Sequence, residues 1–203
     1  MFFKRLMSDM VASNCYIIGE SGEAAVIDPG VDNVRIKAVL DEQKLILKYI
    51  ILTHAHIDHI LYMEELQKSC GGHIAIHEAD VPLLGSVMYN GGMIFGMNKI
   101  FKDPDMKLRD GDVLEVGSLK FEIIHTPGHT PGGICIKLGD MLMTGDTLFR
   151  LNVGRTDLGK GDHDQLMNSL NIIMKLDDSI KVFPGHGTQT DIGYERENNM
   201  YLL

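Results

Sequence analysis

The heptapeptide Thr53-His54-Ala55-His56-Ile57-Asp58-His59 decides how this sequence is interpreted. It follows the apolar run 47–52, which predicts a β-strand that leads straight into the histidines. Residues two apart on a strand point to the same side, so His54 and His56 face one position, while Asp58 and His59 enter the next turn. Because imidazole and carboxylate groups crowded together without a cation carry a large electrostatic cost, the cluster predicts a metal site.

Three further potential ligands share a context of strand end and glycine. His129 lies in the turn His125-Thr126-Pro127-Gly128-His129-Thr130-Pro131-Gly132-Gly133, Asp146 follows Met143-Thr144-Gly145, and His186 stands in Pro184-Gly185-His186-Gly187. Glycine lets the backbone approach a bound group, and proline stiffens the loop. We expect these residues to meet the cluster at strand ends, where sites of α/β proteins commonly lie. Four other histidines lack such a motif and are not expected to be ligands: His73, His77, His125 and His163.

Length, charge and cysteine content limit the possible partners. The chain has 203 residues with 44% hydrophobic side chains, which predicts a single domain over residues 1–203. The net charge of −9 argues against nucleic acid, because phosphates need a basic surface. No apolar run reaches the roughly 20 residues that span a bilayer, and residues 1–14 do not resemble a signal peptide, so a cytoplasmic protein without a membrane partner is expected. Three cysteines without paired spacing, Cys15, Cys70 and Cys135, are expected to be buried free thiols. The oligomeric state stays open.

The order of apolar patterns predicts an α/β sandwich with two related halves. Helices are expected over 33–43, with Val34, Ala38 and Val39 on one face, over 57–69 and over 164–176. Short strands are expected at 13–19, 24–28, 47–52, 113–116, 119–125, 134–138, 141–144 and 180–183. The segment 85–100 is rich in methionine and glycine, and it could form a lid, an interface or a piece of core.

With these motifs in their order, the sequence resembles the metallo-β-lactamase superfamily, and within it the glyoxalase II-like hydrolases. The resemblance covers nearly the whole chain, through 26–30, 53–59, 125–133, 145–149, 154–157 and 183–187. It implies a four-layer αββα sandwich with metals at one edge of the sheets. It also implies the ligands: His54, His56 and His129 for one metal, Asp58, His59 and His186 for the other, and Asp146 bridging both.

Such a pair of metals has a definite chemistry. Two cations about 3.5–4 Å apart can share a water and hold it as hydroxide at neutral pH. Asp58 and Asp146 are therefore expected to be the catalytic carboxylates, acting with that hydroxide. Zinc is the expected metal, and iron or manganese are alternatives, because histidine and aspartate serve all three.

Three residues are expected to support the ligands or the substrate. Asp28 ends a predicted strand and could accept a hydrogen bond from a ligand histidine, or it could cap the turn Asp28-Pro29-Gly30. Thr53 precedes the first ligand. Arg155 follows the predicted bridge closely and could either meet an anionic substrate or pair with Asp157.

The predicted activity is hydrolysis of a thioester of the S-2-hydroxyacylglutathione (S-lactoylglutathione) type. In full-length glyoxalase II a helical region after the last histidine supplies much of the glutathione site, whereas this chain ends soon after His186, so the acyl and thiol parts stay open. The main alternative is a persulfide dioxygenase with one iron held by His54, His129 and Asp146. Others are a hydrolase of another ester or lactone and a metal-binding scaffold without turnover. A β-lactamase of the common type would place cysteine near Asp146, and a ribonuclease would show a basic face; neither pattern is present.

Overall fold

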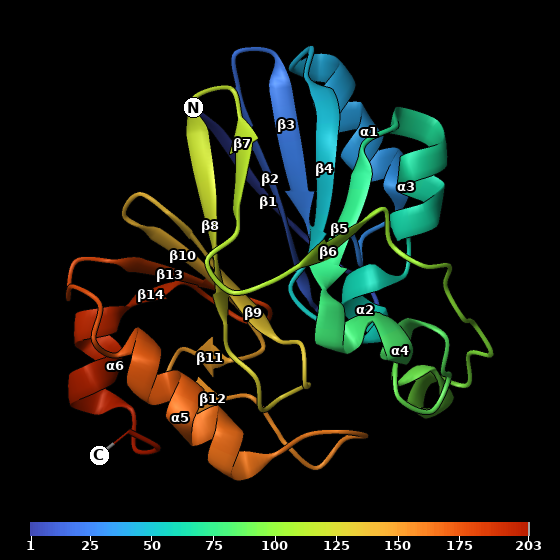
Figure 1. Cartoon of the computed structure of the whole chain (residues 1–203). Helices are drawn as coiled ribbons and strands as arrows, with labels where there is room; N and C mark the ends of the chain where they lie inside the picture. The colour runs from blue at the N-terminus through green and yellow to red at the C-terminus, as the bar shows by residue number, and fades with distance from the viewer. Residues whose placement is uncertain (203) are drawn as a thin grey trace.

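Two six-stranded sheets lie at the centre of the structure, a computed structural model that describes residues 1–202 (Figure 1). The first sheet has the order β1 (Phe2–Met7), β2 (Asn14–Glu20), β3 (Glu23–Ile27), β4 (Ile46–Leu52), β5 (His73–His77) and β6 (Met106–Leu108). The second has the order β14 (Thr190–Asp191), β13 (Lys181–Pro184), β10 (Met141–Gly145), β9 (Ile134–Leu138), β8 (Leu119–His125) and β7 (Val113–Val116). A small hairpin is formed by β11 (Leu148–Phe149) and β12 (Asn152–Val153).

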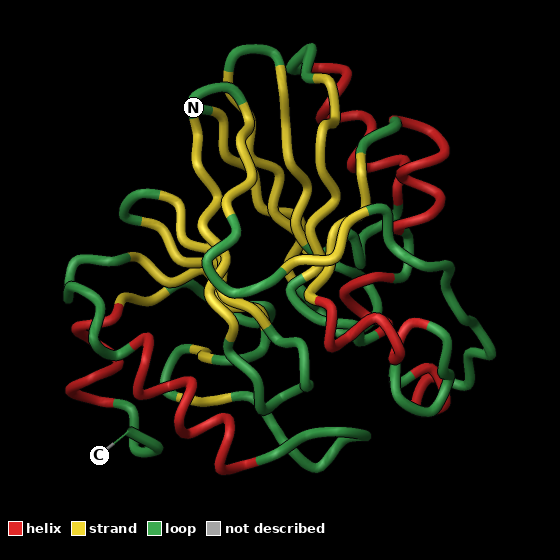
Figure 2. Tube along the Cα trace, viewed as in Figure 1, coloured by secondary structure: helices red, strands yellow, loops and turns green. Residues whose placement is uncertain are grey.

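Helices cover the outer face of each sheet, which gives four layers (Figure 2). The first sheet is covered by α1 (Asn33–Glu42) and α3 (Met63–Cys70), and the second by α5 (His163–Ile173) and α6 (Ile192–Asn198). Shorter helices are α2 (Ile57–Ile60), α4 (Val81–Leu84) and the 3-10 turns η1 (Glu78–Asp80) and η2 (Gly92–Phe95). The expected αββα sandwich is therefore confirmed.

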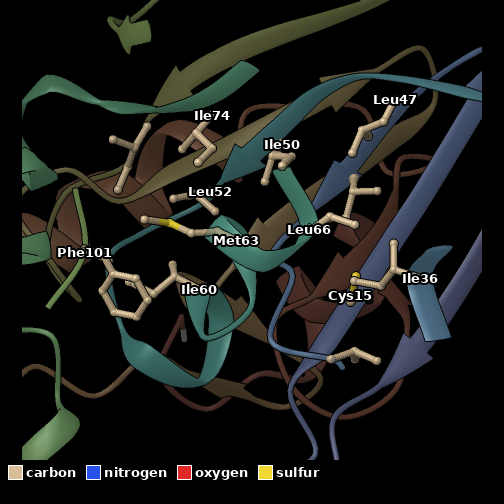
Figure 3. Packing of buried hydrophobic residues seen from close by; sticks show 14 of the residues in the cluster. Cys15, Ile36, Leu47, Ile50, Leu52, Ile60, Met63, Leu66, Ile74 and Phe101 are labelled. Carbon is tan, nitrogen blue, oxygen red and sulfur yellow. The ribbon is translucent and has the colours of Figure 1, made fainter. Parts of the chain in front are cut away.

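The central strands are apolar on both faces because both faces are buried. In β3, Val26 packs with the outer helices, whereas Ile27 points into the layer between the sheets. Figure 3 shows Met63 and Leu66 of α3 in the same apolar cluster as Ile50 of β4. Such strands read as continuous hydrophobic runs rather than alternating ones, which is why they were visible in the sequence.

The two N-terminal helices differ in detail from the prediction. In α1 the buried residues are Ile36 and Leu40, and Val34, expected on the inner face, is 68% exposed. Ile36 and Leu40 are one helical turn apart and pack together, whereas Val34 points elsewhere on the helix.

The expected helix 57–69 is broken between α2 and α3. The carbonyl of Asp58, which would accept the Tyr62 N–H in an unbroken helix, instead accepts the Ser13 hydroxyl at 2.7 Å. The Tyr62 N–H donates to the Pro29 carbonyl at 3.1 Å. These competing bonds end the helix one turn after it begins and tie α2 to the neighbouring loops.

The loops after β4, β8, β10 and β13 meet at one edge of the sandwich. The Ile134 N–H donates to the Thr53 carbonyl at 2.9 Å, which joins the two sheets at this edge. The Gly185 N–H donates to the Gly145 carbonyl at 2.7 Å, which holds the last two loops side by side. Within residues 1–202, no helix is long and apolar enough to cross a membrane.

Candidate metal centre

The structure brings all seven predicted ligands together at this edge. Six of their side chains form two groups, and within each group the ligand atoms lie within 4.8 Å of one another: His54, His56 and His129, and Asp58, His59 and His186. The first group comes from the loops after β4 and β8, and the second from α2 and the loop after β13. Residues distant in the sequence therefore share one site.

Asp146 lies between the two groups. Its Oδ2 is 3.5 Å from Nε2 of His129 in the first group and 3.6 Å from Nε2 of His186 in the second. Its Oδ1 is 3.4 Å from Nε2 of His59. A single carboxylate at these distances lies within reach of both groups, as the predicted bridge requires.

Two of the histidines, His59 and His129, have one ring nitrogen paired with an acceptor outside the centre of the site. His129 Nδ1 faces the carbonyl oxygen of Arg155 at 2.7 Å, so this nitrogen carries the proton and Nε2 is left as an acceptor. His59 Nδ1 likewise faces Oδ2 of Asp28 at 3.0 Å. We assign these tautomers from the hydrogen-bond partners. Metal-binding histidines characteristically donate their other ring nitrogen to a carboxylate or a carbonyl.

Two buried atoms test whether this set of residues fits a cation. His54 Nε2 and Asp146 Oδ1 have no hydrogen-bond partner among the described residues. Two ring nitrogens of the first group also face each other closely, at 2.8 Å between His56 Nδ1 and His129 Nε2. Buried polar atoms normally find partners, so these converging acceptors fit metal ligands.

The titration behaviour agrees with a site built for positive charge. Burial lowers the pKa of His54 well below its ordinary value and that of His56 to about 3, so both are neutral. Burial opposes a charge on His59, yet the carboxylates of Asp58 and Asp146 raise its pKa well above the ordinary value. The carboxylates thus attract a cation at this position, whether a proton or a metal.

Asp28 and Thr53 support the ligands from behind. Asp28 accepts the Thr53 N–H and the Thr53 hydroxyl, each at 2.7 Å, in addition to facing His59. The Thr53 oxygen is also 3.0 Å from Nδ1 of His54. Since the Thr53 hydroxyl donates to Asp28, His54 Nδ1 donates to Thr53 and its Nε2 faces the site. Asp28 therefore orients two histidines, one of them through Thr53.

Of the two roles considered for Arg155, the structure shows the pair with Asp157, and contact with a substrate stays a prediction. Its guanidinium pairs with Asp157 at 2.6 Å and 2.7 Å, and this ion pair is exposed. The residue also lines the pocket above the site, and its carbonyl holds His129.

Of the histidines not expected to be ligands, His77 and His125 stack on each other with ring centroids 3.9 Å apart, outside both groups.

A pocket of about 200 Å³ opens onto the candidate centre. Its floor contains His56, Asp58, His129, Asp146 and His186, and its walls include the apolar residues Val11, Ile94, Phe95 and Leu158. The wall from η2 is anchored by Asn90, whose carbonyl accepts the Ile57 N–H at 2.7 Å. Part of the segment 85–100 is thus a wall of the pocket. The sequence marked this segment as unusual but did not single out its lining residues.

The family model of the metallo-beta-lactamase superfamily matches residues 9–186. The chain belongs to this superfamily. The resemblance carried by the histidine cluster is therefore confirmed at the level of the superfamily, and so is the fold that it implied.

Individual members of the metallo-beta-lactamase superfamily are similar over almost the full length. Hydroxyacylglutathione hydrolase GloC of Haemophilus influenzae is 35% identical over 196 residues, covering 93% of this chain and 92% of that protein. The solved structure of BLEG-1, described as a B3 metallo-beta-lactamase, has a TM-score of 0.93 and 32% identity and covers 99% of both chains. That of TTHA1623, in a di-iron-bound form, has a TM-score of 0.88 and 30% identity and covers 98% of this chain and 100% of that one.

The superfamily and the histidine–aspartate groups together support a metal-dependent hydrolase. The identity of the metal is not decided by these residues, and the di-iron form of TTHA1623 shows that zinc is not the only metal found among similar proteins.

Proposed function

We propose that this chain is a dinuclear metal hydrolase that cleaves a thioester of the S-2-hydroxyacylglutathione (S-lactoylglutathione) type. The observation that carries the proposal is Asp146 between two complete ligand groups, within 3.6 Å of Nε2 of His186 on one side and 3.5 Å of Nε2 of His129 on the other. The similarity to GloC, named as a hydroxyacylglutathione hydrolase, supports the substrate class.

The ligand roles are part of the proposal. One divalent cation would be held by His54, His56 and His129, the other by Asp58, His59 and His186, and Asp146 would contact both. When bound, such a pair supplies a nucleophilic water at neutral pH and polarises the carbonyl that is attacked. The preferred metals are zinc ions, with iron or manganese as alternatives.

Carboxylates of the chain supply negative charge and hydrogen-bond acceptors at the pocket floor. Asp58 lines the pocket and lies 3.2 Å from Nε2 of His186, so its ionised carboxylate can accept a hydrogen bond from the attacking water while it helps to hold the second cation. Burial acts against ionisation of Asp58, but the charge on His59 and a hydrogen bond from His186 hold its pKa well below the usual range. A thiolate can leave without being protonated more readily than an alkoxide can, because a free thiol has a pKa of only about 8.5.

The pocket favours the scissile end of a thioester. Its volume of about 200 Å³ lies below the roughly 300–1,000 Å³ of ordinary ligand pockets, so it holds the acyl group and the carbonyl, and the thiol part extends over the rim. Ile94, Phe95 and Leu158 give the pocket an apolar lining that an acyl group can contact. The Arg155 guanidinium at the rim is a cation that an anionic thiol part of the substrate can reach. Asp157 already pairs with this guanidinium, so the substrate and Asp157 would share it.

The proposal is tested by elemental analysis of the purified protein together with an activity screen. We expect two metal equivalents and hydrolysis of S-lactoylglutathione or a simpler thioester. The substitutions His54→Ala and Asp146→Ala should abolish turnover, whereas His163→Ala, on an exposed histidine outside both ligand groups, should not.

Other outcomes would overturn the proposal in distinct ways. One iron with oxygen uptake on glutathione persulfide would make the chain a dioxygenase. Turnover of β-lactams or lactones without thioesters would leave a hydrolase of another class, and BLEG-1 makes β-lactams a necessary part of the screen. Bound metal without any turnover would indicate a scaffold.

A further inference from the structure

A buried carboxylate that neither faces the pocket nor belongs to the ligand groups lies behind the metal centre. Asp80 ends η1, just after β5, and its side chain is 0% exposed. Burying a carboxylate without hydrogen-bond partners is costly, so the donors that pair with its oxygens decide what it does. Burial raises the pKa of Asp80, and its hydrogen-bond donors act against this shift.

Three donors converge on Asp80, and they come from two different loops. Oδ2 accepts the Ala55 N–H at 2.9 Å and the Thr130 hydroxyl at 2.8 Å. Oδ1 accepts the Gly132 N–H at 2.6 Å. Ala55 lies between His54 and His56, and Thr130 directly follows His129. One carboxylate thus connects the two loops that carry the first ligand group.

The packing around Asp80 leaves little freedom for this connection. A Cβ atom on Gly132 would lie 2.5 Å from the Asp80 backbone nitrogen and 2.8 Å from its Cγ, closer than real side chains come. The loop after β8 therefore lies directly against the Asp80 backbone. A shift of either loop would change the spacing of His54 and His56 relative to His129.

The second ligand group has a different anchor. Asp28 faces His59 Nδ1 at 3.0 Å and accepts the Thr53 hydroxyl at 2.7 Å. Among the described residues, the Asp80 carboxylate accepts from Ala55, Thr130 and Gly132 and from neither His59 nor Thr53. Two buried carboxylates therefore support the centre in different ways: Asp28 orients His59 and, through Thr53, His54, whereas Asp80 joins the two loops that carry the first group.

We propose that Asp80 is the positioning residue of the first ligand group, setting the spacing between the His54–His56 loop and the His129 loop and so the retention of the metal there. This inference rests on the ligand assignment of the proposed function and not on its substrate. It concerns metal affinity, which is measured without any turnover.

The decisive variant is Asp80→Asn, which keeps the size of the side chain. An amide has one acceptor oxygen, so either orientation points N–H groups at a backbone N–H, that of Ala55 or that of Gly132. We expect the metal of the first group to be bound about tenfold to 100-fold more weakly, as is usual for partners that orient ligands. Competition with a chelator followed by elemental analysis should then show one retained metal equivalent where the unmodified chain retains two.

Glu195→Gln is the matched control. Glu195 is also 0% exposed. Its carboxylate also has three donors: the Leu151 N–H, the Thr190 hydroxyl and the Asn199 side-chain amide. If Glu195→Gln lowers the melting temperature as much as Asp80→Asn does but keeps both metals, then the metal loss in Asp80→Asn is specific to the centre. Equal metal loss in the two variants would overturn the inference.

A cycle of variants assigns the effect to one group. In a His186→Ala background, which weakens the second group, Asp80→Asn should release the metal that remains in the first group. In a His129→Ala background, which already weakens the first group, Asp80→Asn should cause no further loss of metal. Should Asp80→Asn fail to fold, Thr130→Val, which removes one of the three donors, should weaken metal binding in the same direction. Unchanged affinity of the first group in whichever of these variants folds refutes the role of Asp80. Two tightly bound metals without thioester hydrolysis would refute the substrate and leave this inference standing.

Discussion

Replacing Gly185 by alanine should misplace the bridging carboxylate. A Cβ atom at this position would lie 2.1 Å from Oδ1 of Asp146, whereas ordinary contact begins at 3.4 Å, so the carboxylate must retreat by about 1.3 Å (3.4 − 2.1). The Gly185 backbone cannot give way easily. Its N–H donates to the Gly145 carbonyl and its carbonyl accepts the Asn14 N–H, each at 2.7 Å. A displacement of about 1 Å at a reacting centre costs about 100-fold in rate, equivalent to about 2.7 kcal/mol.

The assay is kcat/KM for thioester hydrolysis, read beside metal content. We expect Gly185→Ala to lose about 100-fold in kcat/KM and to bind metal more weakly, because the shared ligand is displaced. Gly85→Ala is the matched control, since nothing lies within 4 Å of the added methyl group and its φ of −82° suits alanine. Full activity and two metals in Gly185→Ala would refute the bridging role given to Asp146. Thermal unfolding of both variants separates this effect from a general loss of stability.

Three further predictions concern the surroundings of the centre. Asp28→Asn should weaken metal binding about 10-fold to 100-fold in chelator competition, because one amide oxygen replaces the two carboxylate oxygens that accept from Thr53 and His59; unchanged affinity would contradict the orienting role. Ile94→Asp should raise KM for thioesters with an apolar acyl group while shifting stability by no more than about 0.5 kcal/mol, since Ile94 is 60% exposed; a KM that stays constant would remove it from the binding wall. Arg155→Ala should cost less than about 1 kcal/mol in unfolding, because its pair with Asp157 is exposed, and it should keep both metals, because only its carbonyl holds His129; metal loss would count against this account.

The sequence predicted which histidines and aspartates converge, because each of them lies in a local pattern. His54 and His56 follow an apolar strand, and the spacing by two alone directs both side chains to one side. His129, Asp146 and His186 each follow a strand in a glycine-bearing turn, which is a signal within a few residues. The central strands were visible for a similar reason, because burial on both faces makes them continuous apolar runs.

Prediction was weaker where long-range hydrogen bonds compete with local preference. The apolar pattern of 57–69 fits one helix, yet Ser13 and Pro29 take the bonds that would continue it past Asp58. Strand β1 was not predicted, because its exposed charged residues Lys4 and Arg5 hide its alternation, and only its pairing with β2 shows it to be a strand. Val34 is apolar but exposed, so its side chain did not reveal the face that α1 buries.

The residue types and strand-end positions of the ligands were determined by the sequence itself, because these are properties of short segments. Their convergence was decided by the tertiary structure, which places Asp146 between two groups and closes the pocket with Ile94 and Phe95. The role proposed for Asp80 likewise depends only on the tertiary structure. Nothing in its neighbourhood in the sequence indicates that its carboxylate joins Ala55 to Thr130, since hydrogen bonds between residues 25 and 50 positions away depend on how the two sheets are stacked.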